Sequence, residues 1–318
     1  MNPLEPSPQR FANPFTRYLA ATRPAFLGVT LVGTLIGLGS ASADGLTINV
    51  AKALLTVFFA FMAHAGANVI NDYYDALSGT DASNHERLFP FTGGSRFIQN
   101  GVLNLRETRL FGYGLLASVI PAGLWLTAHS AGGLIVIGLA GLLIAWAYSA
   151  PPLQLMARGA GEAAITGGWL LVVLGTDFVQ RGEFAARPLV AGLPFALLVA
   201  AILYLNQFPD VQADAAAGKR TLIVRLGPQT ARWGYVALTA SAYLWLAFAV
   251  ILEALPAWCA AGLLPAVLSF GASRRLLEEA GNPSALAPAI RQTIAAANVN
   301  GLLIAITLAL SHRGGLLA

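Results

Sequence analysis

Apolar stretches of about twenty residues alternate with short polar segments along nearly the whole chain. This is the pattern of membrane-spanning helices, because about 20 apolar residues cross the hydrocarbon core of a bilayer. The sequence predicts about nine helices, at 19–40, 50–75, 108–128, 131–149, 162–180, 188–208, 230–252, 255–275 and 290–311. We expect an all-α membrane bundle in which residues 19–311 form one domain between an N-terminal arm (1–18) and a short C-terminal tail (312–318).

The composition supports a membrane protein. Hydrophobic residues make up 56% of the chain and charged residues 11%, whereas a soluble domain carries about 25% charged residues. The long runs of Leu, Ala, Val and Gly favour helices over the short alternating segments of a membrane barrel. The single cysteine, Cys259, lies in an apolar run and cannot form an intramolecular disulfide.

The basic residues predict the orientation. With the N-terminus in the cytoplasm, every Lys and Arg falls on the inner side except Lys52, Arg181, Arg187 and Arg313. The positive-inside rule therefore predicts an inner-membrane protein whose C-terminus is outside and whose two long polar loops, 76–107 and 209–229, are cytoplasmic. This distribution explains the net charge of +4 without a nucleic-acid partner.

The two cytoplasmic loops begin with related acidic motifs. Residues 66–81 read GANVINDYYDALSGTD, and residues 206–221 read NQFPDVQADAAAGKRT. Asn71 and Asp75 recur as Asn206 and Asp210, with one offset of 135 for both pairs (206 − 71 and 210 − 75). The repeat suggests two related halves of four helices, followed by a ninth helix.

These motifs place several carboxylates at the mouth of an apolar bundle. Asn and Asp at i and i+4 share a helix face, as do Asp210 and Asp214. Unpaired carboxylates repel one another, and Mg²⁺ bound by carboxylates together with substrate phosphates removes that conflict. The expected catalytic carboxylates are Asp72, Asp75, Asp210 and Asp214. Basic residues that can grip a diphosphate are Arg96, Arg158, Lys219 and Arg220.

Most of these residues have a plainer alternative. The four basic candidates can serve as topology anchors on the inner side. Asp81 can be a turn residue, and Glu162 can cap the fifth helix rather than contact a substrate. His64 is expected to be a packed polar residue, and Tyr73 and Tyr74 to line the cavity or lie at the membrane interface.

The motifs resemble those of the UbiA superfamily of intramembrane prenyltransferases over about 20–310. The resemblance rests on Arg23–Pro24, NDYYD at 71–75, TGGSR at 92–96, YSAPPLQL at 148–155, GE at 161–162 and DVQADAAAGKRTLIVRLG at 210–227. Within the superfamily, NDYYDALSGTD is most similar to menaquinone-branch enzymes that prenylate 1,4-dihydroxy-2-naphthoate. The chain departs from the family pattern at Met156, Ala157, Gln207 and Pro209, which affects the naming of the acceptor rather than the reaction class.

The resemblance implies a site. Six residues would hold Mg²⁺ and diphosphate, with Asp72 adjacent: Asn71, Asp75, Asp81, Asn206, Asp210 and Asp214. Lys219 and Arg220 would bind the diphosphate.

The expected reaction is transfer of a polyprenyl group from its diphosphate to an aromatic acceptor within the membrane. The allylic cation formed on ionisation would be shielded from water and stabilised by the ring of Tyr73, Tyr74 or Tyr148. One alternative is a cyclase on the same scaffold, which would use the prenyl diphosphate without an acceptor. Another is a transporter with acidic ion sites at broken helices. Prenyl length, acceptor, general base and oligomeric state stay open.

Overall fold

A computed structural model describes residues 5–314, so that residues 1–4 of the predicted arm and 315–318 of the predicted tail lie outside the described range. Within that range, every regular element is helical. The α-helices are α1 (Pro14–Ala21), α2 (Pro24–Ala43), α3 (Val50–Ser78), α4 (Thr80–Ser83), α5 (Leu105–His129), α6 (Leu134–Ala147), α7 (Gly161–Arg181), α8 (Arg187–Ala216), α9 (Leu222–Leu226), α10 (Pro228–Ile251), α11 (Ala266–Glu279) and α12 (Ala287–Gly314). Three short 3₁₀ helices are η1 (Met156–Arg158), η2 (Ala257–Leu263) and η3 (Pro283–Ala285).

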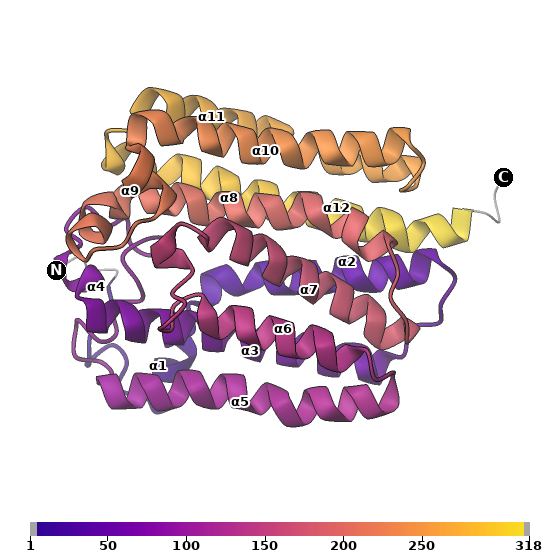
Figure 1. The fold of residues 1–318 in the computed structure, drawn as a ribbon, viewed down its shortest axis with the longest axis horizontal. Helices are drawn as coiled ribbons and strands as arrows, with labels where there is room; N and C mark the ends of the chain where they lie inside the picture. The colour runs from indigo at the N-terminus through magenta and orange to yellow at the C-terminus, as the bar shows by residue number, and fades with distance from the viewer. Residues whose placement is uncertain (1–4, 315–318) are drawn as a thin grey trace.

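The long helices run side by side along one axis of the molecule (Figure 1). The short helices α4 and α9 gather at one end of the bundle, and α12 ends at the opposite end. The most extensive packing joins α3 with α5, α2 with α12 and α7 with α8. The expected all-α membrane bundle is confirmed.

Each predicted span contains helix, but the lengths differ from expectation. In the described part of the chain, seven helices are long and apolar enough to cross a membrane, and α6 is a shorter apolar helix. The predicted span 255–275 is divided into η2 and α11 near Pro265. The predicted span 19–40 is divided between α1 and α2, where Arg23 adopts a left-handed conformation directly before Pro24.

The helix α8 lies at the centre of the bundle. In its most apolar 18-residue window 72% of the residues are buried, against 22% for α5, which exposes Leu105, Leu110 and Trp125. A helix that is apolar all round is expected in the interior, and exposed apolar side chains on the periphery suit contact with lipid. Close helix approach also depends on small residues: a Cβ at Gly37 of α2 would lie 2.5 Å from the backbone oxygen of Val173 on α7.

The acidic motifs lie on α3 and α8, which are the two longest helices among α1 to α8. The helix α3 has 29 residues and α8 has 30, and each is followed by a glycine with a positive φ angle, Gly79 and Gly218. A left-handed glycine ends a helix without the steric cost that a Cβ would bring. Before these glycines, both helices continue past their apolar segments. They present Asn71 and Asp75 on α3, and Asn206 and Asp210 on α8, at the same end of the molecule. Their matched lengths are consistent with two related halves.

Candidate active site

A cavity of about 540 Å³ opens among α2, α3, α5, α6, α7 and α8. Its walls are mostly apolar, and polar residues concentrate where α3 and α8 end. Eight of the residues predicted from the sequence line it: Asn71, Asp75, Asp81, Tyr148, Asn206, Asp210, Asp214 and Lys219. The structure therefore brings the two acidic motifs to one cavity.

Lys219 joins the two acidic motifs. Its ammonium nitrogen lies 2.8 Å from Asp75 Oδ1 on α3 and 3.3 Å from Asp214 Oδ1 on α8. Burial by itself would lower the pKa of Lys219, but the charges of Asp75 and Asp214 outweigh it and raise that pKa above its ordinary value. Lys219 is therefore a buried cation at the mouth of the cavity.

The second motif is held by a loop between α4 and α5. The side chain of Asn84 donates a hydrogen bond of 2.5 Å to Asp210 Oδ1, and the backbone N–H of Gly93 donates one of 3.4 Å to Asp210 Oδ2. The Asn206 side chain donates to the Phe91 carbonyl at 3.4 Å, whereas its Oδ1 is buried without a partner. An unpaired buried oxygen beside carboxylates points to a missing donor or cation.

Asp81 also lies against this loop. Gly94 has a φ of +72°, and a Cβ there would collide with the Asp81 carboxylate. Burial raises the pKa of Asp81 well above its ordinary value, and the charges of Asp75 and Asp72 raise it further. A second cation beside Asp81 would relieve this repulsion.

Two predicted residues support the loop rather than line the cavity. Asp72 is buried, and its Oδ1 accepts the backbone N–H of Ser95 at 3.2 Å. Arg96 is also buried, with a φ of 66°, and its guanidinium donates to the Asp81 carbonyl. Neither Asp72 nor Arg96 is among the residues that line the cavity.

Four other predicted residues lie away from the cavity. The Tyr74 hydroxyl pairs with the Tyr113 hydroxyl of α5 at 2.8 Å, and the Tyr73 ring packs on Tyr74. The expectation that one of these tyrosines lines the cavity is not met, because Asn71 and Asp75 lie on the face of α3 that lines the cavity and the two tyrosines do not. Arg158 donates to the Pro152 carbonyl at 2.7 Å, and Arg220 is exposed.

Several cavity residues were not assigned a role from the sequence. Arg23 reaches the Phe91 carbonyl at 3.2 Å, and its Nε is buried without a partner. Its place in the Arg23–Pro24 motif was the available signal. Asn68 shares the α3 face of Asn71, a spacing that could have identified it. The Gln207 side chain donates to Glu162 at 2.6 Å, so Glu162 contacts α8 rather than acting only as a helix cap.

The donor set fits a divalent metal whose shell is shared with a substrate. Among residues 5–314, no three His, Cys, Asp or Glu side chains come close enough to hold a metal by themselves. The mouth nonetheless combines hard oxygen donors on two helices with the unpartnered Asn206 Oδ1. Mg²⁺ is bound in this manner, through few protein carboxylates together with water and phosphate oxygens.

Comparisons with known proteins agree with this geometry. The model of the UbiA prenyltransferase family matches residues 30–291. The chain is 30% identical to a 1,4-dihydroxy-2-naphthoate octaprenyltransferase of Mycobacterium leprae (strain TN), over 88% of this chain and 91% of that protein. It is 26% identical to the Escherichia coli (strain K12) protein of the same name, over 93% and 96% of the two chains.

A solved structure shares the fold. A UbiA homolog from Archaeoglobus fulgidus, bound to DMAPP and Mg²⁺, superposes with a TM-score of 0.62 at 19% identity, covering 88% of this chain and 98% of that one. The family match spans most of the chain, and the relatives are named as prenyltransferases. The chain is therefore a prenyl-transferring membrane enzyme that belongs to the UbiA prenyltransferase family.

Proposed function

We propose that this enzyme transfers a polyprenyl group from prenyl diphosphate to 1,4-dihydroxy-2-naphthoate, with Mg²⁺ as its cofactor. The observation that carries the proposal is the buried Lys219, held between Asp75 and Asp214 at the polar mouth of an otherwise apolar cavity. The mouth suits a diphosphate, and the apolar walls suit a hydrocarbon chain. The names of the relatives support the acceptor.

Different residues at the mouth would bind the metal and the diphosphate. The metal would be held by Asp75, Asp81, Asp210 and Asp214, with Asn71 and Asn206 as further oxygen donors. When bound, Mg²⁺ would neutralise part of the negative charge of the diphosphate. Lys219 donates hydrogen bonds to the same group and stabilises the charge that grows on it as it leaves.

The transfer breaks the bond between the allylic carbon and the diphosphate oxygen, and the diphosphate takes the electron pair. An electron-rich ring carbon of the acceptor then forms the new carbon–carbon bond. The ring regains its aromaticity by losing the group that this carbon carried, which is a proton taken up by the departed diphosphate or, at the carboxylated carbon, CO₂. The apolar walls exclude water from the allylic cation. Tyr148 lines the cavity beside Asn71, where the face of its ring can stabilise that cation. We further propose that this mouth faces the cytoplasm across the inner membrane, as the distribution of basic residues predicts.

Product analysis by mass spectrometry tests the proposal. Purified enzyme in lipid receives prenyl diphosphates of several lengths with naphthoate, hydroxybenzoate or homogentisate acceptors, each with and without Mg²⁺. We expect a prenylated naphthoate product that forms only with the metal. A cyclic hydrocarbon formed from prenyl diphosphate alone would instead identify a cyclase, and selective prenylation of hydroxybenzoate would overturn the proposed acceptor.

A further inference from the structure

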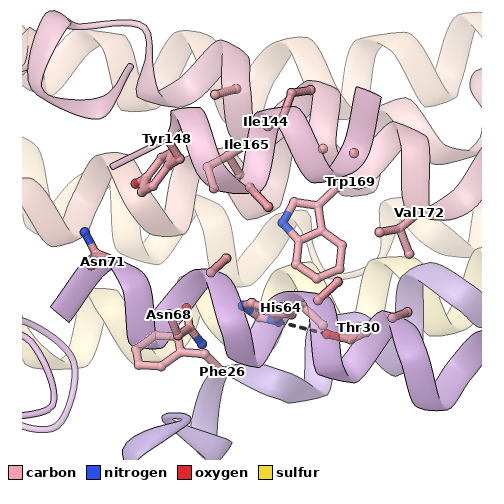
Figure 2. A pocket seen from close by; sticks show the side chains of 18 of the residues that line it. Phe26, Thr30, His64, Asn68, Asn71, Ile144, Tyr148, Ile165, Trp169 and Val172 are labelled. Atoms are coloured by element: carbon pink, nitrogen blue, oxygen red, sulfur yellow. Dashed lines mark hydrogen bonds between the residues drawn. The ribbon is translucent and has the colours of Figure 1, made fainter. Parts of the chain in front are cut away.

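His64 lies on the cavity wall, and the transfer chemistry described above does not use it. It shares one face of α3 with Asn68 and Asn71, which follow it at i+4 and i+7. At a rise of 1.5 Å per residue, His64 is roughly 10 Å from Asn71 along the helix, away from the acidic mouth. Figure 2 shows His64 between Asn68 and Trp169, with a hydrogen bond to Thr30 at one ring nitrogen.

The hydrogen bond with Thr30 bears on which ring nitrogen of His64 carries the proton. Thr30 Oγ1 lies 2.8 Å from His64 Nδ1, and Thr30 is fully buried. Within residues 5–314, the Thr30 hydroxyl has no other hydrogen-bond partner. Because the buried Thr30 hydroxyl has no other acceptor among these residues, we assign it as the donor to Nδ1. In this assignment neutral His64 carries its proton on Nε2.

The other ring nitrogen is an unused donor at the cavity. No backbone or side-chain group of the described chain accepts a hydrogen bond from His64 Nε2. The ring is held in place, because Trp169 packs edge-on against it at a centroid distance of 5.2 Å. An N–H that meets only hydrocarbon loses the hydrogen bond it had in water, at a cost in free energy. A ligand oxygen at this point would restore that bond.

The cavity has two chemically different sides. The side formed by α5 and α6 is apolar, with Val119, Ile120, Leu124, Leu139 and Leu142 among its residues. Its threonine, Thr127, bonds to the Gly123 carbonyl of its own helix. This side suits a hydrocarbon chain.

The opposite side, which we call the aromatic side, consists of Phe26, Thr30, His64, Asn68 and Trp169. Figure 2 shows these side chains grouped around one part of the cavity. The Asn68 amide nitrogen donates to the Thr22 carbonyl at 3.1 Å, which fixes the direction of its side chain. Two flat ring systems with a hydrogen-bond donor between them suit a planar aromatic molecule that carries oxygen substituents.

We propose that His64 Nε2 donates a hydrogen bond to an oxygen substituent of the aromatic acceptor, and that the aromatic side is the acceptor's binding site. The inference deepens the proposed function and rests on it. A site that is built to hydrogen-bond a substrate oxygen discriminates against an analogue that lacks that oxygen, because the protein donor is then left unpaired. His64 is therefore a specificity-determining residue for the acceptor.

The test compares two substitutions at His64. His64→Gln keeps an N–H donor at a similar reach, whereas His64→Leu keeps the bulk and removes the donor. We expect His64→Leu to raise the KM for the acceptor about tenfold, the effect of one lost hydrogen bond, and to leave the KM for prenyl diphosphate unchanged. His64→Gln should restore most of the acceptor affinity. Thr239→Val, a buried polar-to-apolar change on α10 outside the cavity, is the matched control.

Acceptor analogues identify the bond itself. Wild type and His64→Leu are assayed with 1,4-dihydroxy-2-naphthoate and with analogues that each lack one oxygen substituent. For the wild type, one analogue should have a higher KM than the parent acceptor. For His64→Leu, the same analogue and the parent should have equal KM values, because the variant has no donor to leave unpaired. Additive losses for every analogue would overturn the proposal, as would equal changes in the KM of both substrates.

Two further measurements keep the outcome clear. Binding of the acceptor alone, without turnover, should raise the melting temperature of the wild type and of His64→Gln, and raise that of His64→Leu less at the same acceptor concentration. If His64→Leu does not fold, Thr30→Val serves in its place, because it keeps the ring but frees the proton to move to Nδ1. If the wild type prenylates the naphthoate and the His64 variants show the same kinetics, the role of His64 is refuted and the proposed function stands. A wild type that uses no naphthoate acceptor refutes the proposed function.

Discussion

The Lys219 ammonium nitrogen lies 2.8 Å from Asp75 Oδ1, so that a cation following α8 in the chain is anchored on α3. We expect Lys219→Ala to raise the KM for prenyl diphosphate tenfold or more, about the effect of losing a charge-assisted hydrogen bond. Inorganic diphosphate should also inhibit the variant less than the wild type. Initial rates at varied prenyl diphosphate, with and without inorganic diphosphate, measure both effects.

Arg220, the next residue in the chain, provides the control for Lys219. Its side chain is exposed and does not line the cavity, so Arg220→Ala should have a much smaller effect on both measurements. Equal kinetics for the wild type and Lys219→Ala would show that Lys219 only anchors the topology. A large effect of Arg220→Ala would mean that the segment after α8 closes further over the bound substrate than the structure shows.

Asp210→Asn should nearly abolish turnover while the protein still inserts and folds. The substitution removes a negative oxygen from the mouth but retains the side-chain shape, and the loss of metal-mediated charge stabilisation can cost several kcal/mol. Turnover is measured across a range of Mg²⁺ concentrations, and melting temperature reports the fold. Glu278→Gln, an exposed change on α11, is the control. Near-normal turnover of Asp210→Asn at ordinary Mg²⁺ would contradict the assigned role, and so would full activity of the wild type after chelation of divalent metals.

Gly94→Ala should inactivate the enzyme more strongly than it destabilises the fold. Gly94 and Gly101 both have a positive φ angle, +72° and +70°, but only at Gly94 would a Cβ collide with Asp81. The matched control Gly101→Ala should therefore lose about 1 kcal/mol of stability from the backbone alone and keep its turnover. Melting temperature and turnover of the two variants separate backbone strain from displacement of Asp81. Similar turnover in both variants would exclude a role for the contact between Gly94 and Asp81.

The N-terminal arm should detach from the loop of the active site at acidic pH. Burial would raise the pKa of Glu5, but hydrogen bonds from Arg87 and Asn100 and the charge of Arg87 hold it below its ordinary value of 4.5. A carboxylate with a lowered folded pKa contributes stability above its unfolded pKa, and that contribution is lost as the pH falls through the folded value. Arg87 lies 2.7 Å from Glu5 and also bonds the Asn84 carbonyl at 2.6 Å, so the arm reaches a residue that holds Asp210.

Hydrogen exchange of residues 5–13 measures this attachment. The ratio of exchange rates between Glu5→Gln and the wild type should be well above one at about pH 6 and should approach one as the pH falls below about 4. The two proteins share their intrinsic exchange chemistry, so the ratio cancels the direct effect of pH. A ratio that stays constant over this range would contradict an attachment through ionised Glu5.

The sequence by itself determined the membrane class and the family. Long apolar runs predict spanning helices because an unpaired backbone group in lipid is too costly for any open structure. The recurrence of Asn71 and Asp75 as Asn206 and Asp210 identified the acidic mouth, because carboxylates at the end of an apolar helix need a cation. These inferences depend on local composition and spacing, which the chain carries without reference to its fold.

The tertiary structure decided which neighbours of those residues face the cavity. Asp72, Tyr73 and Tyr74 lie beside Asn71 and Asp75 in the sequence, yet the pairing of Tyr74 with Tyr113 and of Asp72 with Ser95 directs them elsewhere. Helices that are apolar on every side carry no strong preference for one face. Their rotation is fixed by packing against neighbouring helices, and the sequence does not state that packing. For the same reason only the folded chain placed Lys219 between Asp75 and Asp214, and turned the free nitrogen of His64 to the cavity.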